Sequence, residues 1–307
     1  MQQLMRQSPL LRRIWQYKSV YMILLPVLVF FIIFAYMPMV GIQLAFRDFQ
    51  AHLGVWGSPF VGLEKFEMLF QTAAFARAIR NTITISVMKI IFGFPIPILL
   101  ALLINELTNR KLSRVLQTVF TLPHFLSWVV LAGILMNLLG NDGALNNLIA
   151  LMGSDRRGFL TNPGIFRWLL VVTEIWKSSG WAAIMYLAAI ASIDPSLYES
   201  AAIDGASRLQ MVRFITLPGI KIMALILLIL SIGNIMNSNF DQVFNMYNPA
   251  VFSTGDVIDT YLFRVTFQQT PDFGFSTAVG VFRGVINFAL LLTANFVVVK
   301  INKDKLI

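Results

Sequence analysis

Long stretches without a charged side chain are the most constraining feature of this sequence. Three of them, residues 19–46, 115–141 and 222–240, are strongly apolar and are bounded at each end by a charged residue. A helix that crosses the hydrocarbon core of a bilayer needs about 20 consecutive, mostly apolar residues. We therefore predict that each of these stretches forms a membrane-spanning helix.

The overall composition agrees with a protein whose solvent is lipid. Hydrophobic residues make up 57% of the chain and charged residues 13%, whereas a soluble domain has about 25% charged residues. So few polar side chains would not cover the surface of a water-soluble protein of this size. The chain has no cysteine, which excludes disulfide bridges and thiolate metal sites.

Three further apolar stretches carry charged residues in their interiors, and we predict that they also span the membrane. All six stretches together indicate an all-α integral membrane protein with about six transmembrane helices and a single domain over residues 1–307. The three stretches are residues 81–105 with Lys89, residues 168–191 with Glu174 and Lys177, and residues 276–299 with Arg283.

The distribution of Lys and Arg predicts the orientation, because basic residues hold membrane loops on the cytoplasmic side. If the N-terminus is cytoplasmic, the inner segments carry 13 basic and five acidic residues, and the outer segments carry eight basic and nine acidic residues. We therefore expect both termini to be cytoplasmic. The inner basic residues are Arg6, Arg12, Arg13, Lys18, Arg110, Lys111, Arg114, Arg208, Arg213, Lys221, Lys300, Lys303 and Lys305.

This orientation places three long segments, residues 47–80, 142–167 and 241–275, on the outer side of the membrane. Each contains glycine and proline residues that favour turns. These segments either connect the spans or also meet a partner outside the membrane, and both readings stay open.

The inner segment at about residues 192–218 has strong local structure signals. Asp194 is a good helix N-cap and Pro195 suits the first helical position. Gly205 can end the helix with a positive φ, and Pro218 sets the entry to the next span. We predict a short helix, a sharp turn and a second short helix, which either lie at the membrane interface or dock against another protein.

The same segment resembles the cytoplasmic motif of permease subunits of binding-protein-dependent ABC importers. That motif is Glu-Ala-Ala, three residues, Gly, nine residues, then Ile, any residue and Leu-Pro. The chain departs from it in having Ser where the family prefers Ala, and Ser is also small. The matching residues are Glu199, Ser200, Ala201, Gly205, Ile215, Leu217 and Pro218.

Other stretches are similar to the sugar-importing members of this family. They include residues 17–26, residues 36–41 with residues 45–49, and residues 101–106 with residues 122–128. The last pair looks like the branch that imports oligosaccharides cut from polysaccharides. These similarities extend over nearly the whole chain.

The resemblance implies the type I ABC importer permease fold and a location in the bacterial cytoplasmic (inner) membrane. It implies that the helix from Pro195 to Asp204 is a coupling helix, which sits in a groove of an ATPase subunit. Glu199 would pair there with a basic side chain, and Gly205 would allow the tight turn. The implied coupling residues are Glu199, Ser200, Ala201, Asp204, Gly205, Ala206, Leu217 and Pro218.

The implied partners are a second, homologous permease (a heterodimer is expected), two ATP-binding cassette subunits, an extracytoplasmic solute-binding protein and membrane lipid. Nucleic acid is not expected as a partner. We expect no cofactor and no metal in this chain, because ATP and Mg would bind to the ATPase subunits. The sequence agrees, since it contains no Walker-type phosphate loop.

An enzyme is a poor interpretation of this sequence. The chain has two histidines, His52 and His124, and neither has an evident Ser partner for nucleophilic catalysis. We therefore expect a transport subunit, with ATP hydrolysis in a separate partner.

Polar residues within the predicted spans are candidates for a sugar pathway, because polar groups in membrane helices are costly and often functional. Asn234, Asn237 and Asp241 recur at helical spacing, so we predict that they share one helix face. They either line a pore or hydrogen-bond between helices. The candidate pathway residues are Asn234, Asn237, Asn239, Phe240, Asp241, Trp176, Trp181 and Arg283.

Charged and aromatic residues in the spans have alternative interpretations. Glu174 and Lys177 are three residues apart, and we expect them to form an internal pair. Lys89 and Arg283 are alone in the sequence and would snorkel, pair across helices or attract acidic sugars. Trp176 and Trp181 would either stack on sugars or mark the membrane interface.

The predicted function is therefore that of a permease subunit of an ATP-driven importer of an oligosaccharide, and the basic residues near the pore are compatible with uronate-containing sugars. One alternative is a permease of the same fold for another solute, such as glycerol phosphate or an amino acid. Another is a secondary transporter or channel without an ATPase. The coupling motif argues against the latter, as does the lack of a convincing internal repeat.

Overall fold

The computed structural model describes residues 13, 15–237, 239–268 and 271–301, and every element among them is helical. Within these residues, four helices are long and apolar enough to cross a membrane, or up to six if each of two bent helix pairs counts as one span. The predicted all-α membrane fold with about six spans is therefore confirmed. Arg6, Arg12, Lys303 and Lys305, which contributed to the charge count, lie outside the described residues.

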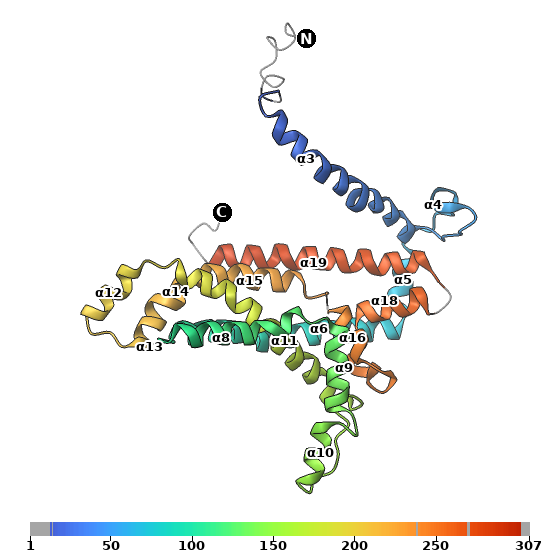
Figure 1. Cartoon of the computed structure of the whole chain (residues 1–307). Helices are drawn as coiled ribbons and strands as arrows, with labels where there is room; N and C mark the ends of the chain where they lie inside the picture. Colours follow the sequence, from blue (N-terminus) through green and yellow to red (C-terminus); the bar gives the residue numbers. More distant parts are fainter. Residues whose placement is uncertain (1–12, 14, 238, 269–270, 302–307) are drawn as a thin grey trace. The chain divides into compact units, whose positions relative to one another are not determined.

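The chain divides into two compact units, one of which comprises the chain up to Met68 together with Asp272–Val281. In this unit α3 (Lys18–Phe31), a π-helical turn (Ile32–Tyr36) and a 3-10 helix (Met37–Phe46) form the first span, drawn in blue in Figure 1. Its residues are exposed from Lys18 to Val40, and Ile23 is 77% exposed, whereas Ala45 near its end is buried. An apolar and unburied helix suits a lipid environment.

The segment that follows the first span in this unit is held by charge pairs. It contains α4 (Gly54–Gly57) and the start of α5 (Glu64–Gln71). The Lys65 ammonium lies 2.9 Å from a carboxylate oxygen of Asp272 and 3.3 Å from one of Asp48. Burial lowers the pKa of Lys65, but the hydrogen bonds and charges of Asp272 and Asp48 outweigh this effect, so the pKa is raised.

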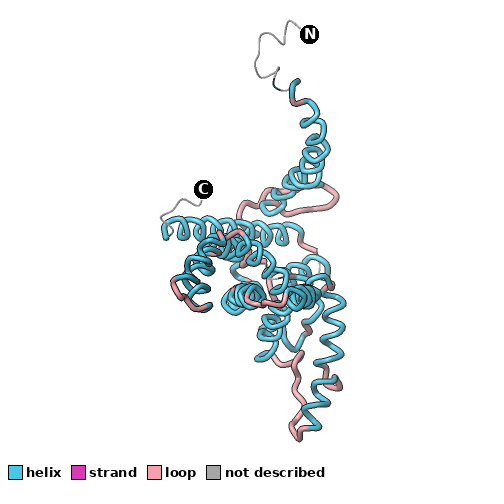
Figure 2. The backbone as a smooth tube through the Cα atoms, turned by 60° about the vertical axis from the view of Figure 1, so that its left-hand side comes forward, coloured by secondary structure: helices cyan, strands magenta, loops and turns pink. Residues whose placement is uncertain are grey.

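The second unit is built around α11 (Pro163–Ala191), which packs against α6 (Ala73–Gly93), α7 (Pro95–Asn105) and α8 (Arg110–Thr121). Figure 1 shows α6, α8 and α11 close together, and Figure 2, turned by 60°, shows a backbone made of helices and connecting loops. Near the end of α11, a small core forms with α7 and the start of α15 (Lys221–Gly233). Its buried members are Ala101, Ala183, Tyr186, Ile190 and Ile220.

A second core joins the beginning of α11 to α9 (Trp128–Leu139) and α16 (Phe240–Met246). The largest buried side chains in it include Phe166, Leu131 and Leu170. The remaining elements of the segments predicted to lie outside the membrane are α10 (Ala144–Leu151), a 3-10 turn (Pro249–Val251), α17 (Phe252–Gly255) and α18 (Ile258–Phe267). The last helix, α19 (Phe273–Ile301), has residues in both units.

The predicted third span, residues 115–141, is wrong as a single helix. α8 ends at Thr121, a 3-10 turn covers Leu122–Phe125, and α9 begins at Trp128. Pro123 lacks the backbone N–H that a continuing helix needs. The candidate span in this region covers Trp128–Leu151 instead and comprises α9 and the short helix α10 (Ala144–Leu151).

The predicted fifth span, residues 222–240, is also broken, because α15 ends at Gly233 and α16 begins at Phe240. Asn234, Asn237 and Asp241 therefore do not share one helix face, and that prediction is wrong. Asn239 has φ of 60°, and among the described residues other than glycine it alone has a positive φ. Side chains of Asn and Asp tolerate this conformation better than most. The prediction that residues 1–307 form one domain stays a prediction.

Candidate functional site: an exposed helical loop and a polar cavity

The loop after α11 folds as its local signals predict. Asp194 Oδ1 accepts a hydrogen bond of 2.9 Å from the backbone N–H of Ser196 and so caps α12 (Pro195–Ile203). This hydrogen bond lowers the pKa of Asp194. Gly205 has φ of +75°, and α13 (Arg208–Met211) follows it. The predicted helix, turn and second helix are thus confirmed.

The turn at Gly205 closes the helix in the manner of a Schellman motif. The N–H of Ala206 donates to the carbonyl of Ala201 at 2.9 Å, and the N–H of Gly205 donates to that of Ala202 at 3.1 Å. These bonds satisfy carbonyl groups that the end of a helix leaves without partners. The loop is therefore an ordered structure rather than a loose connector.

α12 presents apolar as well as charged side chains to its surroundings. None of its residues is buried, Ile203 is 87% exposed, and Leu197 is 51% exposed. Figure 1 shows α12 and α13, in yellow, at the end of the second unit. An exposed apolar surface of this kind is typical of a protein docking site. Glu199 and Ser200 are also exposed on α12.

One hydrogen bond ties α12 to the helix that follows the loop. Tyr198 Oη and Thr216 Oγ1 are 2.9 Å apart, and Thr216 is 1% exposed. Thr216 ends a π-helical turn (Val212–Thr216) that leads into α14 (Leu217–Gly219). The helices on either side of Ile220 are bent by 56°. The predicted coupling residues thus lie on α12, on its terminal turn and at the start of α14.

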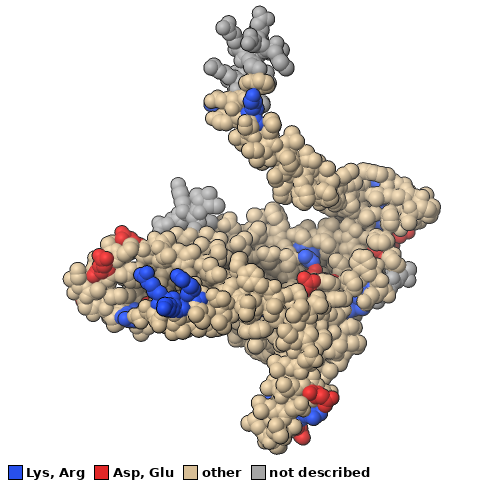
Figure 3. All heavy atoms as spheres, viewed as in Figure 1, with Lys and Arg blue, Asp and Glu red and all other residues tan. Residues whose placement is uncertain are grey.

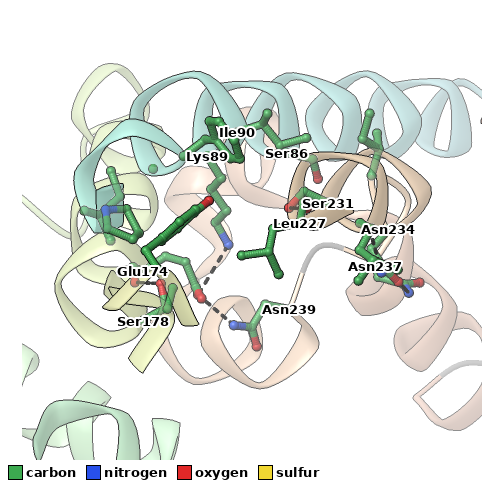
Figure 4. A pocket seen from close by; sticks show the side chains of 18 residues that line it. Ser86, Lys89, Ile90, Glu174, Ser178, Leu227, Ser231, Asn234, Asn237 and Asn239 are labelled. Atoms are coloured by element: carbon green, nitrogen blue, oxygen red, sulfur yellow. Dashed lines mark hydrogen bonds and ion pairs between the residues drawn. The ribbon is translucent and has the colours of Figure 1, made fainter. Parts of the chain in front are cut away.

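A cavity of about 570 Å³ lies within the second unit, between α6, α7, α11 and α15. Figure 4 shows the polar side chains that line it, which come from α6, α11, α15 and the segment after α15. Hydroxyl and amide groups both donate and accept hydrogen bonds, as sugar hydroxyls require. The polar lining residues are Ser86, Lys89, Glu174, Ser178, Tyr186, Ser231, Asn234, Asn237 and Asn239.

Charged and amide side chains at the cavity wall form a hydrogen-bonded network. Lys89 Nζ on α6 donates to Gln242 Oε1 on α16 at 2.5 Å and lies 3.8 Å from Glu174 Oε2 on α11. The same Glu174 oxygen accepts a hydrogen bond of 2.7 Å from Asn239 Nδ2. Gln242 is fully buried and is oriented by its own donation to the carbonyl of Leu170 at 2.7 Å. Three helices are therefore joined through polar groups that would be costly to bury alone.

The structure brings together three of the eight predicted pathway residues. Asn234, Asn237 and Asn239 line the cavity. The other five do not line the cavity. Phe240 packs against Phe244 and Phe263, and Trp181 stacks on His124 with ring centroids 4.7 Å apart. Arg283 pairs with Asp259, and Asp241 and Trp176 are exposed.

The predicted pair of Glu174 and Lys177 is wrong. Lys177 Nζ instead donates to the backbone carbonyls of His124 and Leu126, each at 2.7 Å, and Glu174 pairs with Lys89. Of the alternatives for Lys89, pairing across helices is therefore observed, but sequence reasoning did not identify Glu174 as its partner. The signal that was present is the occurrence of an acid and a base on two different predicted spans, where each needs a partner. Among the described residues, no group of three or more His, Cys, Asp or Glu could hold a metal ion.

Comparison with known proteins gives consistent results. Residues 93–299 match the family described as binding-protein-dependent transport system inner membrane component. The polygalacturonan/rhamnogalacturonan transport system permease protein YteP of Bacillus subtilis (strain 168) is 39% identical, over 97% of this chain and 93% of that protein. Protein LplB of the same organism is 38% identical, over 94% of this chain and 91% of its own length.

Two solved structures are similar over nearly the whole chain. One is a bacterial ABC transporter involved in the import of the acidic polysaccharide alginate, with 40% identity, a TM-score of 0.89 and coverage of 96% of this chain and 100% of that chain. The other is a bacterial alginate ABC transporter in complex with an alginate pentasaccharide-bound periplasmic protein. It has 40% identity, a TM-score of 0.88 and coverage of 96% and 99%.

Proposed function

This chain belongs to the family of binding-protein-dependent transport system inner membrane components, and from that premise we propose that it imports an oligosaccharide delivered by an extracytoplasmic solute-binding protein. The chain is a permease subunit of an ABC transport system and not an enzyme. It is also a multi-pass membrane protein.

The exposed surface of α12 is the observation that carries the coupling part of this proposal. Its terminal turn is fixed by Gly205, and its unburied apolar side chains are available to a groove in another subunit. We assign α12 as the coupling helix, with Glu199 as the residue that pairs with a basic side chain of the partner. ATP and Mg bind to two ATPase subunits, whose closure moves α12.

The lining of the cavity supports a sugar as the substrate. Its amides and hydroxyls can exchange hydrogen bonds with sugar hydroxyls, and its other walls are apolar. The relative YteP is named for polygalacturonan and rhamnogalacturonan, and the two similar structures are named for alginate. We therefore assign an oligosaccharide released from a polysaccharide, rather than glycerol phosphate or an amino acid.

The remaining partners and the orientation complete the proposal. The permease pairs with a second, homologous permease as a heterodimer in the bacterial cytoplasmic membrane, and both termini are cytoplasmic. Figure 3 supports this orientation, because Lys and Arg side chains gather beside α8 and α13, the end that carries α12. Basic residues on α8 include Arg110, Lys111 and Arg114.

The first test is gentle solubilisation of the assembled protein, identification of its partners by mass spectrometry, and assay of ATP-dependent sugar uptake after reconstitution into liposomes. We expect an ATPase with a Walker loop and a second permease. A protein that purifies without an ATPase and still transports alone would contradict the proposal and favour a secondary transporter or channel.

A matched pair of variants tests the role of α12. Glu199→Ala should reduce uptake and stimulated ATP hydrolysis by roughly tenfold, the effect of losing one charge-assisted contact. Glu64→Ala, which changes an exposed glutamate on α5, should leave both unchanged. Equal uptake by the two variants would remove Glu199 from the coupling mechanism.

A further inference from the structure

We propose that Lys89 binds a carboxylate of the transported sugar and that Glu174 competes for the same ammonium, so that the cavity selects acidic oligosaccharides and still releases them. This inference rests on the proposed function, because it names the substrate class of the same cavity. It assigns specificity to a residue pair within the membrane spans rather than to the binding protein alone.

The geometry around Lys89 leaves room for a further acceptor. An ammonium has three donor positions, and Gln242 Oε1 takes one of them at 2.5 Å. Glu174 Oε2 stands at 3.8 Å, well beyond the 2.7–2.9 Å or so of a charge-assisted hydrogen bond. Lys89 Nζ lies at the cavity (Figure 4). An incoming carboxylate can therefore take the place of Glu174 beside the Lys89 ammonium.

Glu174 has a second partner that remains when the ammonium turns to a ligand. Asn239 Nδ2 donates to Glu174 Oε2 at 2.7 Å, which is shorter than the distance from that oxygen to Lys89. Asn239 belongs to the irregular segment between α15 and α16, not to a helix. Glu174 can thus stay hydrogen-bonded while it shares Lys89 with a sugar carboxylate.

The rest of the cavity has the chemistry of a neutral sugar site. Among the described residues that line the cavity, Lys89 is the one cation and Glu174 is the one anion. The side chains of Lys89 and Glu174 are 15% and 24% exposed. Charges interact more strongly in such surroundings than in water. Discrimination between acidic and neutral sugars therefore falls on Lys89.

Two other cations in the spans of this unit are already committed to partners. Lys177 donates to three backbone carbonyls, and Arg283 pairs with Asp259, whose side chain is 12% exposed. Neither residue lines the cavity. Of the two residues for which attraction of an acidic sugar was one alternative, Lys89 lines the cavity and Arg283 does not.

Glu174 has a clear purpose under this proposal. A transport site must bind its cargo firmly enough to accept it and weakly enough to release it. A carboxylate that competes for Lys89 lowers the affinity for an acidic sugar without altering contacts to sugar hydroxyls. Removal of the Glu174 charge should consequently strengthen binding, which is the opposite of what loss of a purely structural ion pair would do.

The experiment uses the complete transporter in nanodiscs, with hydrolysis arrested by ADP and vanadate. Binding of trigalacturonate is compared with binding of the corresponding neutral galactose trimer, made by reduction of the carboxyl groups. We expect the wild-type transporter to bind trigalacturonate at least about tenfold more tightly, a ratio that corresponds to about 1.4 kcal/mol.

The variants give effects of opposite sign. Lys89→Met should bring the ratio of the two affinities to about one, and Glu174→Gln should raise the affinity for trigalacturonate alone. The control Lys111→Met, at an exposed position of α8, should behave as wild type. If Lys89→Met alone does not fold, the double variant Lys89→Met/Glu174→Gln replaces it, because it leaves no unpaired charge. This double variant should bind the two trimers equally.

Two outcomes overturn the inference. One is equal affinity of the wild type for both trimers, or binding of neither. The other is a decrease in affinity for both trimers in Glu174→Gln, which would identify the pair as structural. Co-purification of an ATPase and ATP-dependent uptake are scored separately, so that their presence alongside equal affinities rejects only this inference, and their absence rejects the proposed function.

Discussion

The ammonium of Lys177 lies 2.7 Å from the backbone carbonyl oxygen of Leu126, at the break between α8 and α9. It also donates to the carbonyls of His124 at 2.7 Å and Pro123 at 3.3 Å. A break in a helix leaves backbone carbonyl groups without partners in the helix. Lys177 supplies the donors that the broken helix lacks.

Replacement of Lys177 by methionine should therefore destabilise the protein. The carbonyls would lose a charged donor, and the expected cost is on the order of 3 kcal/mol. Thermal unfolding in detergent, followed by tryptophan fluorescence, measures this loss. Lys111→Met is the control, because Lys111 is exposed on α8. If both variants melt together, the contacts of Lys177 contribute nothing to stability.

Gly180 allows α11 to approach α8 closely. A β-carbon at this position would overlap the backbone of Phe120 and lie 2.7 Å from the backbone nitrogen of Thr121. Gly180→Ala should therefore force the helices apart and lower the yield of folded protein sharply. Gly133→Ala on α9 meets nothing within 4 Å, and it should be neutral or stabilising by up to about 1 kcal/mol. Gel filtration of both variants after membrane extraction tests the contrast.

At Gly205, in the turn after α12, the backbone conformation restricts the side chain although the surrounding space does not. A β-carbon at Gly205 meets no atom within 4 Å, yet φ of +75° disfavours most side chains. Gly205→Val should disturb the turn, because a left-handed conformation costs an ordinary residue about 1–2 kcal/mol. Gly205→Asn should retain most of the sugar uptake, since Asn tolerates positive φ. Similar uptake by both variants would show that the turn can be remade without loss.

The tie between Lys65, Asp48 and Asp272 predicts a pH dependence with a definite sign. The pKa of Lys65 is raised above its ordinary value of 10.5, so the folded state binds this proton more tightly than the unfolded state does. The resulting stability is fully present below the unfolded pKa and is lost as pH rises through the folded pKa. Proteolytic cleavage within residues 47–63 should be faster in Lys65→Met than in wild type at pH 7 to 9, and the difference should shrink above about pH 10.5. A difference that grows with pH would contradict this assignment.

Local signals predicted the loop around α12 well, because each acts over a few residues. Asp194 caps, Pro195 begins the helix and Gly205 ends it, and none of these depends on distant parts of the chain. The long stretches without charged residues likewise predicted a membrane-spanning protein. The assignments of the coupling and pathway residues stay predictions that the experiments above test.

The errors arose where long-range partners decide the structure. Lys177 is three residues from Glu174, but carbonyls freed at Pro123 compete for its ammonium more effectively. Glu174 then pairs with Lys89 on another helix. Charge counting also overlooked the break at Gly233, since an amide-rich segment carries no charge and still interrupts a helix. The partners of Lys177 and Glu174 and the helix break at Gly233 cannot be predicted from residue spacing alone.

The distance in sequence between Lys89 and its partners imposes an order on biosynthesis. α6 is translated before α11, and Gln242 follows Lys89 by 153 residues. A cation at membrane depth is costly until its partner arrives. A nascent chain that ends before α11 therefore exposes an unmatched charge to the bilayer. The unpaired ammonium of Lys89 therefore distinguishes an incompletely inserted permease from a complete one, and it gains its partners only when the later helices have been inserted.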